Sequence, residues 1–501
     1  MDFSLLREMA AGNAWWSIWP ELGLGCLALL LLVLETALPA AAHRRIPAVS
    51  ILGQLALLLA VLLTYDCSAA HETFNGLIGL SPTGEFFRVY FLLSSLLVSI
   101  LARVSLARQA VPRTEFHHVT LVVSAAAMLL VQSRNFVMLF VALETMTIGL
   151  YILVSYYRAN PRTLEAGLKY LIMGALSSAL LLFGIVLLYG AAGNPALSGH
   201  TAQAMQFAGL YGFLADNPRN FAAAAGIVLV LSGLAFKIGG FPFQIWIPDV
   251  YEGAPTPVTA LLAVTSKAAG FVVLIALVKV FAPYAWLVES VLTLMAAATV
   301  LFGNLAALKQ HNVKRLIGLS GVSHAGFLLL GVASLGAAPG AEGAVYFYLF
   351  AYLIASFAVF GVMTALGGPD DTRQELGDYS GLARESPFLG GVLACGLGSL
   401  AGIPPLAGFL GKLFIFVAAF RAGHYGLLLV AIIGVVISIY YYFGWIRMAY
   451  FSDEVAAAPG SATRAAASAG LTLKVALALL AAASIVIGFY PGPLGQLVSG
   501  L

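Results

Sequence analysis

The chain is poor in charge. Only 9% of its 501 residues are charged, whereas 61% are hydrophobic. Soluble domains are about half apolar and one quarter charged, so a water-soluble fold could not hide this much apolar surface. Long uncharged runs lie inside stretches close to the ~20 residues that a helix needs to cross a bilayer, at 27–34, 55–63 and 475–487. The composition therefore predicts an all-α polytopic membrane protein.

Motifs for metal centres and for nucleotides are also missing. Cys26, Cys67 and Cys395 stand far apart and form no CxxC pair, so no zinc or iron–sulfur ligand set is expected. The run 406–412 ends in Gly-Lys but lacks the leading glycine of a phosphate loop, and Leu413 follows it. We therefore expect this chain to hold no metal or cofactor and to bind no nucleic acid.

Apolar runs bounded by charge, glycine and proline predict about fourteen membrane-spanning helices. The expected spans lie near residues 17–39, 46–65, 84–104, 115–132, 135–157, 163–190, 220–252, 255–282, 286–308, 313–335, 341–367, 387–420, 424–450 and 471–492.

The basic residues indicate how these spans are oriented, because Lys and Arg gather in cytoplasmic loops. Because the loops richer in Lys and Arg should be cytoplasmic, both termini are expected on the periplasmic side of a bacterial inner membrane. Tryptophans 15, 16 and 19 and tyrosines 440–442 fall near predicted span ends, as interfacial aromatic belts do. One set of alternate loops holds Arg44, Arg45, Arg103, Arg108, Arg113, Arg158, Arg162, Lys309, Lys314, Arg315, Arg373 and Arg384, and the other has chiefly Arg7, Arg134, Arg219 and Arg421.

Two of the spans are interrupted near their middles. Glycine and proline at these points free backbone groups at membrane depth, which survive only in protein or beside a water-filled cavity. Paired interruptions in two halves of a chain are typical of transporters with inverted repeats. The first interruption contains Gly239, Gly240 and Pro242, and the second contains Gly402, Pro404 and Pro405.

Four ionisable residues lie deep inside predicted spans: Glu144, Lys237, Lys267 and Lys412. Each costs ~3 kcal/mol on insertion scales, so each needs a partner, water or a function. Glu144 and Lys237 could form a buried salt bridge that only fixes helix packing. However, such pairs are often replaceable by apolar residues without loss of stability. Desolvation disfavours a lone lysine's charged form, so Lys267 should be able to release and regain a proton.

Other titratable residues have simpler interpretations. His324 could join a proton relay because histidine titrates near neutral pH, but it could equally be a satisfied packing residue. Glu165 and Lys169, spaced i to i+4, are expected to form an interfacial ion pair. Glu21 and Glu35 lie toward span ends and are expected to reach water.

Four segments resemble the antiporter-like subunits shared by respiratory complex I, multi-subunit cation/proton antiporters and membrane hydrogenases. The most specific is FKIGGFPFQIWIPDVYEGAPTPVTALLAVTSK, residues 236–267. Together with LEAGLKYLIMGALSSALLLFG, residues 164–184, it looks most like subunit N of complex I. Supporting runs are FGNLAALKQHNVKRLIGLSGVSHAGF and LAGIPPLAGFLGKLF, residues 302–327 and 400–414.

The resemblance implies a fold of two inverted five-helix bundles, each with one broken helix. It divides the chain into flanking helices at 1–114, bundles at 115–282 and 283–450, and a last loop and span at 451–501. Glu144 and Lys237 match the family's Glu and Lys pair, and Lys267 matches its central relay position. Lys412 matches the charged residue of the second broken helix, where subunit M typically carries Glu.

The resemblance further implies a proton-translocating subunit of NADH:quinone oxidoreductase. NADH, FMN, iron–sulfur clusters and quinone are then expected in other subunits. The implied partners are the antiporter-like subunit M, small membrane subunits such as K and J, and lipids.

Two other functions remain open. A subunit of a cation/proton antiporter would share the fold but not the redox partner. A structural subunit would hold a membrane arm together without conducting protons.

Overall fold

The computed structural model describes residues 13–66, 71–368, 371, 373–451 and 470–501. Arg7 and Cys67, named above, lie outside these residues. Helices dominate the described part, and two short antiparallel strands, β1 (His71–Thr73) and β2 (Ile78–Leu80), form a hairpin. The prediction of an all-α polytopic membrane protein is confirmed.

Six helices precede the first interruption. The prediction missed a seventh, α8, which lies in the loop before α9. The six are α2 (Trp19–Ala37), α3 (Ile46–Leu63), α4 (Pro82–Ser105), α5 (Thr114–Val131), α6 (Phe136–Val154) and α7 (Pro161–Ala192), and α8 spans Phe207–Asp216.

The remaining helices include one π-helical turn, η4, between α11 and α12. They are α9 (Phe221–Ile238), α10 (Ile247–Gly253), α11 (Thr256–Leu261), η4 (Leu262–Ser266), α12 (Lys267–Val280), α13 (Ala285–Ala307), α14 (Val313–Ala333), α15 (Ala341–Leu366), α16 (Leu382–Glu385), α17 (Pro387–Ala401), α18 (Ala407–Arg421), α19 (Tyr425–Phe451), α21 (Gly470–Phe489) and α22 (Gly492–Ser499). Short 3-10 turns are η1 (Trp15–Ile18), η2 (Ala40–Arg45), η3 (Leu106–Arg108), η5 (Ala282–Tyr284) and η7 (Leu376–Tyr379).

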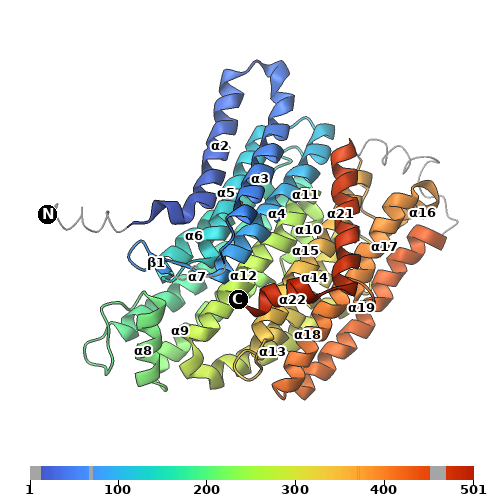
Figure 1. The fold of residues 1–501 in the computed structure, drawn as a ribbon. Coiled ribbons are helices and arrows are strands. Elements are labelled where there is room, and N and C mark those ends of the chain that lie inside the picture. The colour runs from blue at the N-terminus through green and yellow to red at the C-terminus, as the bar shows by residue number, and fades with distance from the viewer. Residues whose placement is uncertain (1–12, 67–70, 369–370, 372, 452–469) are drawn as a thin grey trace.

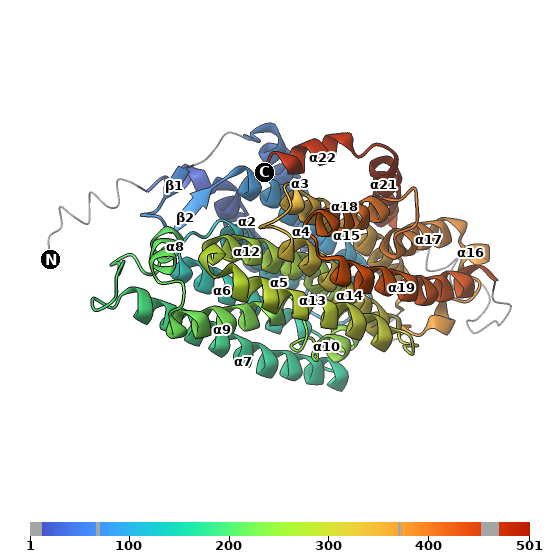
Figure 2. The same ribbon diagram turned by 90° about the horizontal axis from the view of Figure 1, so that it is seen from below.

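Within the described residues, thirteen helices are long and apolar enough to cross a membrane. α17 and α18 are each too short alone, and together they cover the expected span at 387–420. The helices from α5 to α12 lie beside those from α13 to α19 (Figure 1). Viewed from below, α14 and α15 lie near the middle of the molecule (Figure 2), and their apolar windows are 100% and 94% buried. Every residue in the apolar window of α14 is buried, so this helix forms the centre of the bundle.

Asparagine caps set the starts of four spans. Asn135, Asn160, Asn220 and Asn312 each precede a helix, and each side-chain oxygen accepts a hydrogen bond from a backbone N–H of the first turn. These bonds satisfy donors that have no partner inside the helix. The caps therefore fix where α6, α7, α9 and α14 begin.

Both interrupted spans end their first half in the same way. α9 ends before Gly239 (φ +75°) and α17 ends before Gly402 (φ +85°), and both glycines are left-handed. In each case an N–H beyond the helix turns back to a carbonyl of the last turn, Ala235 or Gly398. Glycine adopts this conformation without steric cost, which explains why a helix can end here inside the bundle. A cis X-Pro bond follows each glycine, at 241–242 and 404–405.

The expectation that Glu21 reaches water is wrong. Its carboxylate is buried against Arg88 of α4, with Nε and Nη2 of the guanidinium 2.8 and 3.0 Å from its two oxygens. Gln132 donates a further hydrogen bond to Glu21 at 2.6 Å, and Glu85 also binds Arg88. The partner of Glu21 lies 67 residues away in the chain. This cluster ties α2, α4 and α5 together.

The aromatic-belt interpretation of tyrosines 440–442 is also wrong in part. Tyr440 is exposed, whereas Tyr441 and Tyr442 are buried in the bundle. All three lie well before the end of α19 at Phe451. Trp15 and Trp16 are exposed near the start of α2, where a belt residue belongs.

We predict that Glu21→Gln lowers the stability of the protein by about 3 kcal/mol, because it leaves Arg88 buried with half of its charge compensation. The midpoint of thermal unfolding in detergent measures this. Glu35→Gln is the matched control, since Glu35 is partly exposed and should tolerate the change. Equal midpoints for the two variants would show that the cluster does not stabilise the fold.

Candidate functional site

Three lysines and one histidine lie in the interior of the helical bundle. Lys237, Lys267 and Lys412 are only 5%, 3% and 3% exposed, and His324 is 2% exposed. They belong to four helices, α9, α12, α18 and α14. Charged groups at such depth are costly and typically functional. We therefore take them as the candidate site and consider each side chain in turn.

Lys237 lies in the last turn of α9, just before the first break. Its Nζ donates a hydrogen bond to the hydroxyl of Thr147 on α6. Glu144 lies nearly one turn before Thr147 on the same helix, is half-buried, and accepts a hydrogen bond of 2.6 Å from Ser178 on α7. No ion pair joins Glu144 to Lys237 in the part of the chain described here. Lys237 therefore contacts the face of α6 that carries Glu144, and each of the two ionisable groups has a neutral partner.

Lys267 follows the π-helical turn η4 as the first residue of α12. Its Nζ donates to the backbone oxygen of Gly321 on α14 at 2.6 Å and lies 5.1 Å from the centre of the Tyr352 ring. Gly270 lets α12 approach α9, because a Cβ there would lie 2.8 Å from Ile238 and 3.5 Å from Cβ of Lys237. Close helix packing thus brings the stems of the first two lysines to neighbouring positions.

His324 is held between two tyrosines. Its Nδ1 hydrogen-bonds the hydroxyl of Tyr348 on α15, and its Nε2 lies 2.9 Å from the hydroxyl of Tyr442 on α19. Both ring nitrogens therefore have partners that can donate or accept a proton. The ring is satisfied, as a packing histidine is, and it is also part of a chain of exchangeable protons.

Lys412 reaches back across the second break. Its Nζ donates to the backbone oxygens of Leu400 and Ala401, at 2.8 and 3.0 Å. These are carbonyls of the last turn of α17, which have no partner within the helix and carry its negative partial charge. The ammonium group also lies 5.1 Å from the centre of the Phe327 ring. The broken helix therefore supplies the group that holds this lysine.

One face of α14 connects the second lysine with the third. Gly321 accepts from Lys267, His324 follows three residues later, and Phe327, three residues later again, contacts Lys412. At 1.5 Å per residue, Gly321 and Phe327 are ~9 Å apart along the axis. The imidazole therefore lies between the two amines.

A second group of charges lies at the span ends that carry the basic loops. Asp249 of α10 binds Lys169 at 2.6 Å and Arg315 at 2.7 Å, and the predicted pair of Lys169 with Glu165 is present at 2.7 Å. These side chains are partly exposed. They form a surface network apart from the buried lysines.

Sequence reasoning missed the partners of the ionisable groups. They are the hydroxyls of Thr147, Ser178, Tyr348 and Tyr442 and the backbone oxygens of Gly321, Leu400 and Ala401. The run of three tyrosines was the one available signal for Tyr442. The contact of Lys267 with the Gly321 carbonyl could not be predicted, because every residue has a backbone carbonyl.

The geometry suits proton exchange better than metal binding. Within the described residues no group of three or more His, Cys, Asp or Glu could hold a metal ion. Each buried amine instead contacts a neutral oxygen, which stabilises the ammonium form less than a carboxylate would. Amines, imidazole and hydroxyl groups are all groups that can bind and release a proton.

Comparisons with known proteins agree on one family. Residues 133–438 match the family model described as NADH:quinone oxidoreductase/Mrp antiporter, TM. The chain is 63% identical over 499 residues to NADH-quinone oxidoreductase subunit N 1 of Opitutus terrae, covering 99% of both chains. A chain of respiratory complex I from Thermus thermophilus is 30% identical with a TM-score of 0.77, over 96% of this chain and 100% of that one.

A structure of the Mrp complex from a Dietzia species gives a TM-score of 0.79 at 22% identity, over 96% of both chains. At that identity the likeness shows the fold alone.

The burial of the three amines predicts their chemical reactivity. In membrane fragments that expose both faces to the reagent, a water-soluble amine-reactive reagent should modify the exposed Lys279 and Lys309 and leave Lys237, Lys267 and Lys412 unmodified. Mass spectrometry of the peptides measures this. After denaturation in detergent all five should react. Native labelling of Lys267 at the rate seen for Lys279 would contradict the buried site.

Proposed function

The chain belongs to the subunit N family of NADH-quinone oxidoreductases, and from this premise we propose that its buried side chains form a proton relay. Members of this family are multi-pass proteins of the bacterial inner membrane and subunits of a proton-translocating oxidoreductase. The relay would comprise Glu144, Lys237, Lys267 and Lys412, with His324 between the last two. It would move protons while the complex passes electrons from NADH to quinone.

The observation that carries the proposal is the chemistry of the partners of the three amines, which are hydroxyl and carbonyl oxygens and not carboxylates. An ion pair would hold the proton on the lysine, whereas hydroxyl and carbonyl partners leave it more easily released. Glu144 and Lys237 lie on facing positions without an ion pair. A closed Glu144–Lys237 pair would keep the proton, and the open arrangement would let it move on toward Lys267.

The α14 face supports the step from Lys267 to Lys412. His324 lies between the contacts of the two lysines, and each of its nitrogens bonds a hydroxyl. Neutral imidazole can take a proton on one nitrogen and release one from the other. His324 would therefore carry the proton from Lys267 in the first bundle to Lys412 in the second.

The wider assignment follows from the family. We place NADH, FMN, iron–sulfur clusters and quinone in other subunits, and subunits M, K and J beside this one. The similar terminations of α9 and α17 support two inverted bundles at 115–282 and 283–450. The distribution of Lys and Arg between alternate loops supports a periplasmic position for both chain termini.

An antiporter subunit is the weaker alternative. The Mrp likeness extends only to the fold, whereas the relative from Opitutus terrae matches across the whole length. A structural subunit that conducts no protons is tested by the variants below.

We expect Lys237→Ala to lower both proton pumping and NADH-to-quinone electron transfer by about tenfold or more, because the relay loses a proton carrier and the two processes are coupled. Both are measured in membrane vesicles with assembly of the complex checked on native gels. Lys309→Ala, at an exposed loop position, is the control. Full retention of both activities in an assembled Lys237→Ala complex would leave this lysine as a structural charge.

Gly321→Ala should impair pumping without removing any titratable group. A Cβ at this position would lie 3.0 Å from Nζ of Lys267 and 3.2 Å from the Tyr352 hydroxyl, so both flexible ends must shift. We expect a several-fold loss of pumping and normal assembly. Gly391→Ala is the matched control, since no atom lies within 4 Å of its added Cβ. Equal pumping by the two variants would argue that the Lys267–Gly321 contact has no role.

A further inference from the structure

A buried polar cluster lies between α3, α4 and α5, outside the group of lysines described above. The side-chain amide of Gln54 on α3 donates to the hydroxyl of Ser99 on α4 at 2.8 Å, and to the hydroxyl of Ser50 at 3.0 Å. Nδ1 of His117 on α5 lies 3.3 Å from the same Ser99 hydroxyl. All four residues are fully buried. Three helices therefore meet at one buried hydroxyl.

Three buried polar atoms of this cluster have no hydrogen-bond partner among the residues that the structure describes. They are Oε1 of Gln54, Nε2 of His117 and Oγ of Ser95. The first two belong to the amide and the ring that contact Ser99. Ser95 lies one turn before Ser99, on the same face of α4. Buried polar atoms nearly always have a partner, either protein or ordered water, so three such atoms around one hydroxyl indicate a ligand.

Turning the Gln54 amide over would not satisfy its oxygen. Its Nε2 also donates to the backbone carbonyl of Ser50 at 3.2 Å, and a carbonyl can only accept. Exchanging the amide nitrogen and oxygen would place two acceptors against each other. Oε1 therefore needs a donor from another source.

We infer that this cluster binds ordered water, with Gln54 Oε1, His117 Nε2 and Ser95 Oγ as its ligands. A water molecule has two donors and two acceptors, so it can donate to the amide oxygen and bond the imidazole and the serine as well. The serine side chains are small and leave space beside the larger glutamine and histidine. No carboxylate, lysine or arginine belongs to the cluster as defined here, and burying an uncompensated ion is costly, so a neutral ligand suits it.

Water at Nε2 gives His117 a partner on each ring nitrogen. His324 has the same two-sided arrangement, with two tyrosine hydroxyls as partners. The cluster is then a second place in the bundle where an imidazole and its partners carry exchangeable protons. The inference rests on hydrogen bonding alone, so it stands whether or not the lysine relay carries protons.

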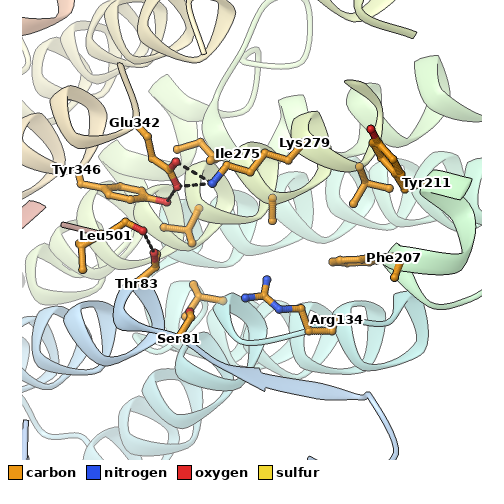
Figure 3. Close-up of a pocket in the computed structure, with 15 residues that line it drawn as sticks. Ser81, Thr83, Arg134, Phe207, Tyr211, Ile275, Lys279, Glu342, Tyr346 and Leu501 are labelled. Carbon is orange, nitrogen blue, oxygen red and sulfur yellow. Dashed lines mark hydrogen bonds and ion pairs between the residues drawn. The ribbon is translucent and has the colours of Figure 1, made fainter. Parts of the chain in front are cut away.

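The cluster is separate from the cavity at the other end of α4. Figure 3 shows that cavity, of about 360 Å³, with Thr83 and Arg134 in its lining. Ser99 lies sixteen residues beyond Thr83 in the chain, which is ~24 Å along the helix axis. The water in the cluster is therefore distinct from any solvent in the cavity.

The first test is a cryo-EM map of the whole purified complex at a resolution that shows ordered water. We expect a water peak within about 3.2 Å of at least two of the three atoms Gln54 Oε1, His117 Nε2 and Ser95 Oγ. A map that shows water elsewhere inside this subunit, but none at these atoms, would overturn the inference. So would side-chain positions in which these atoms bond protein groups directly.

Hydroxyl-radical labelling of the assembled complex gives a second test that needs no high-resolution map. Radicals formed by an X-ray pulse arise from water, so a fully buried side chain is oxidised only where water lies beside it. Mass spectrometry compares the oxidation rate of His117 in wild type, in Gln54→Leu and in Gln203→Leu. Gln203 is exposed in the loop between α7 and α8, which makes it the matched control. Assembly of each variant is checked on native gels.

We expect Gln54→Leu to lower the oxidation rate of His117 about tenfold or more, because leucine removes the amide that binds the water and fills its space. Gln203→Leu should keep the wild-type rate. A wild-type rate no higher than that of Gln54→Leu would show that no water lies beside His117, and the inference would then be wrong.

Discussion

The cost of burying charge and unpaired backbone groups is the constraint on which the rest of this structure depends. α9 and α17 both end inside the bundle, where their last carbonyls have no water to bind. The left-handed Gly239 and Gly402 turn the next N–H groups back onto the helix. Lys412 covers two of the remaining carbonyls of α17. The break supplies hydrogen-bond acceptors for the buried amine, and the amine supplies a donor for the carbonyls that the break leaves without a partner, so an ionisable group is held at membrane depth.

Buried charged groups in this protein have two kinds of partner, an opposite charge or a neutral oxygen. Near the start of α2, Glu21 and Arg88 form a bidentate ion pair that locks three helices. In the interior, Lys237 and Lys267 instead contact a hydroxyl and a carbonyl. A carboxylate partner would favour the charged form strongly, whereas neutral oxygens leave both protonation states accessible. The first arrangement fixes the packing of three helices, and the second is the one that the proposed relay requires.

Most of the fold could be predicted, and the exceptions have two causes. Spans are long, apolar and local, so their extents follow from composition along the chain. α8 was missed because ten residues in a loop give no spanning signal. Glu21 was misread because Arg88 lies far away in sequence, and Tyr442 because its partner His324 lies on another helix. The errors at Glu21 and Tyr442 thus concern contacts between segments that lie far apart in the chain.

The sequence by itself determined the number and course of the spans, the positions of both breaks, the family and the ionisable residues at membrane depth. The spans, the breaks and the ionisable residues follow from residue type and spacing, and the family follows from the resemblance of the segments 164–184, 236–267, 302–327 and 400–414. Only the tertiary structure decided what each buried group touches: Thr147 for Lys237, the Gly321 carbonyl for Lys267, and the end of α17 for Lys412. Such contacts depend on how each helix is rotated and packed, and a backbone oxygen has no signature in the residue that carries it.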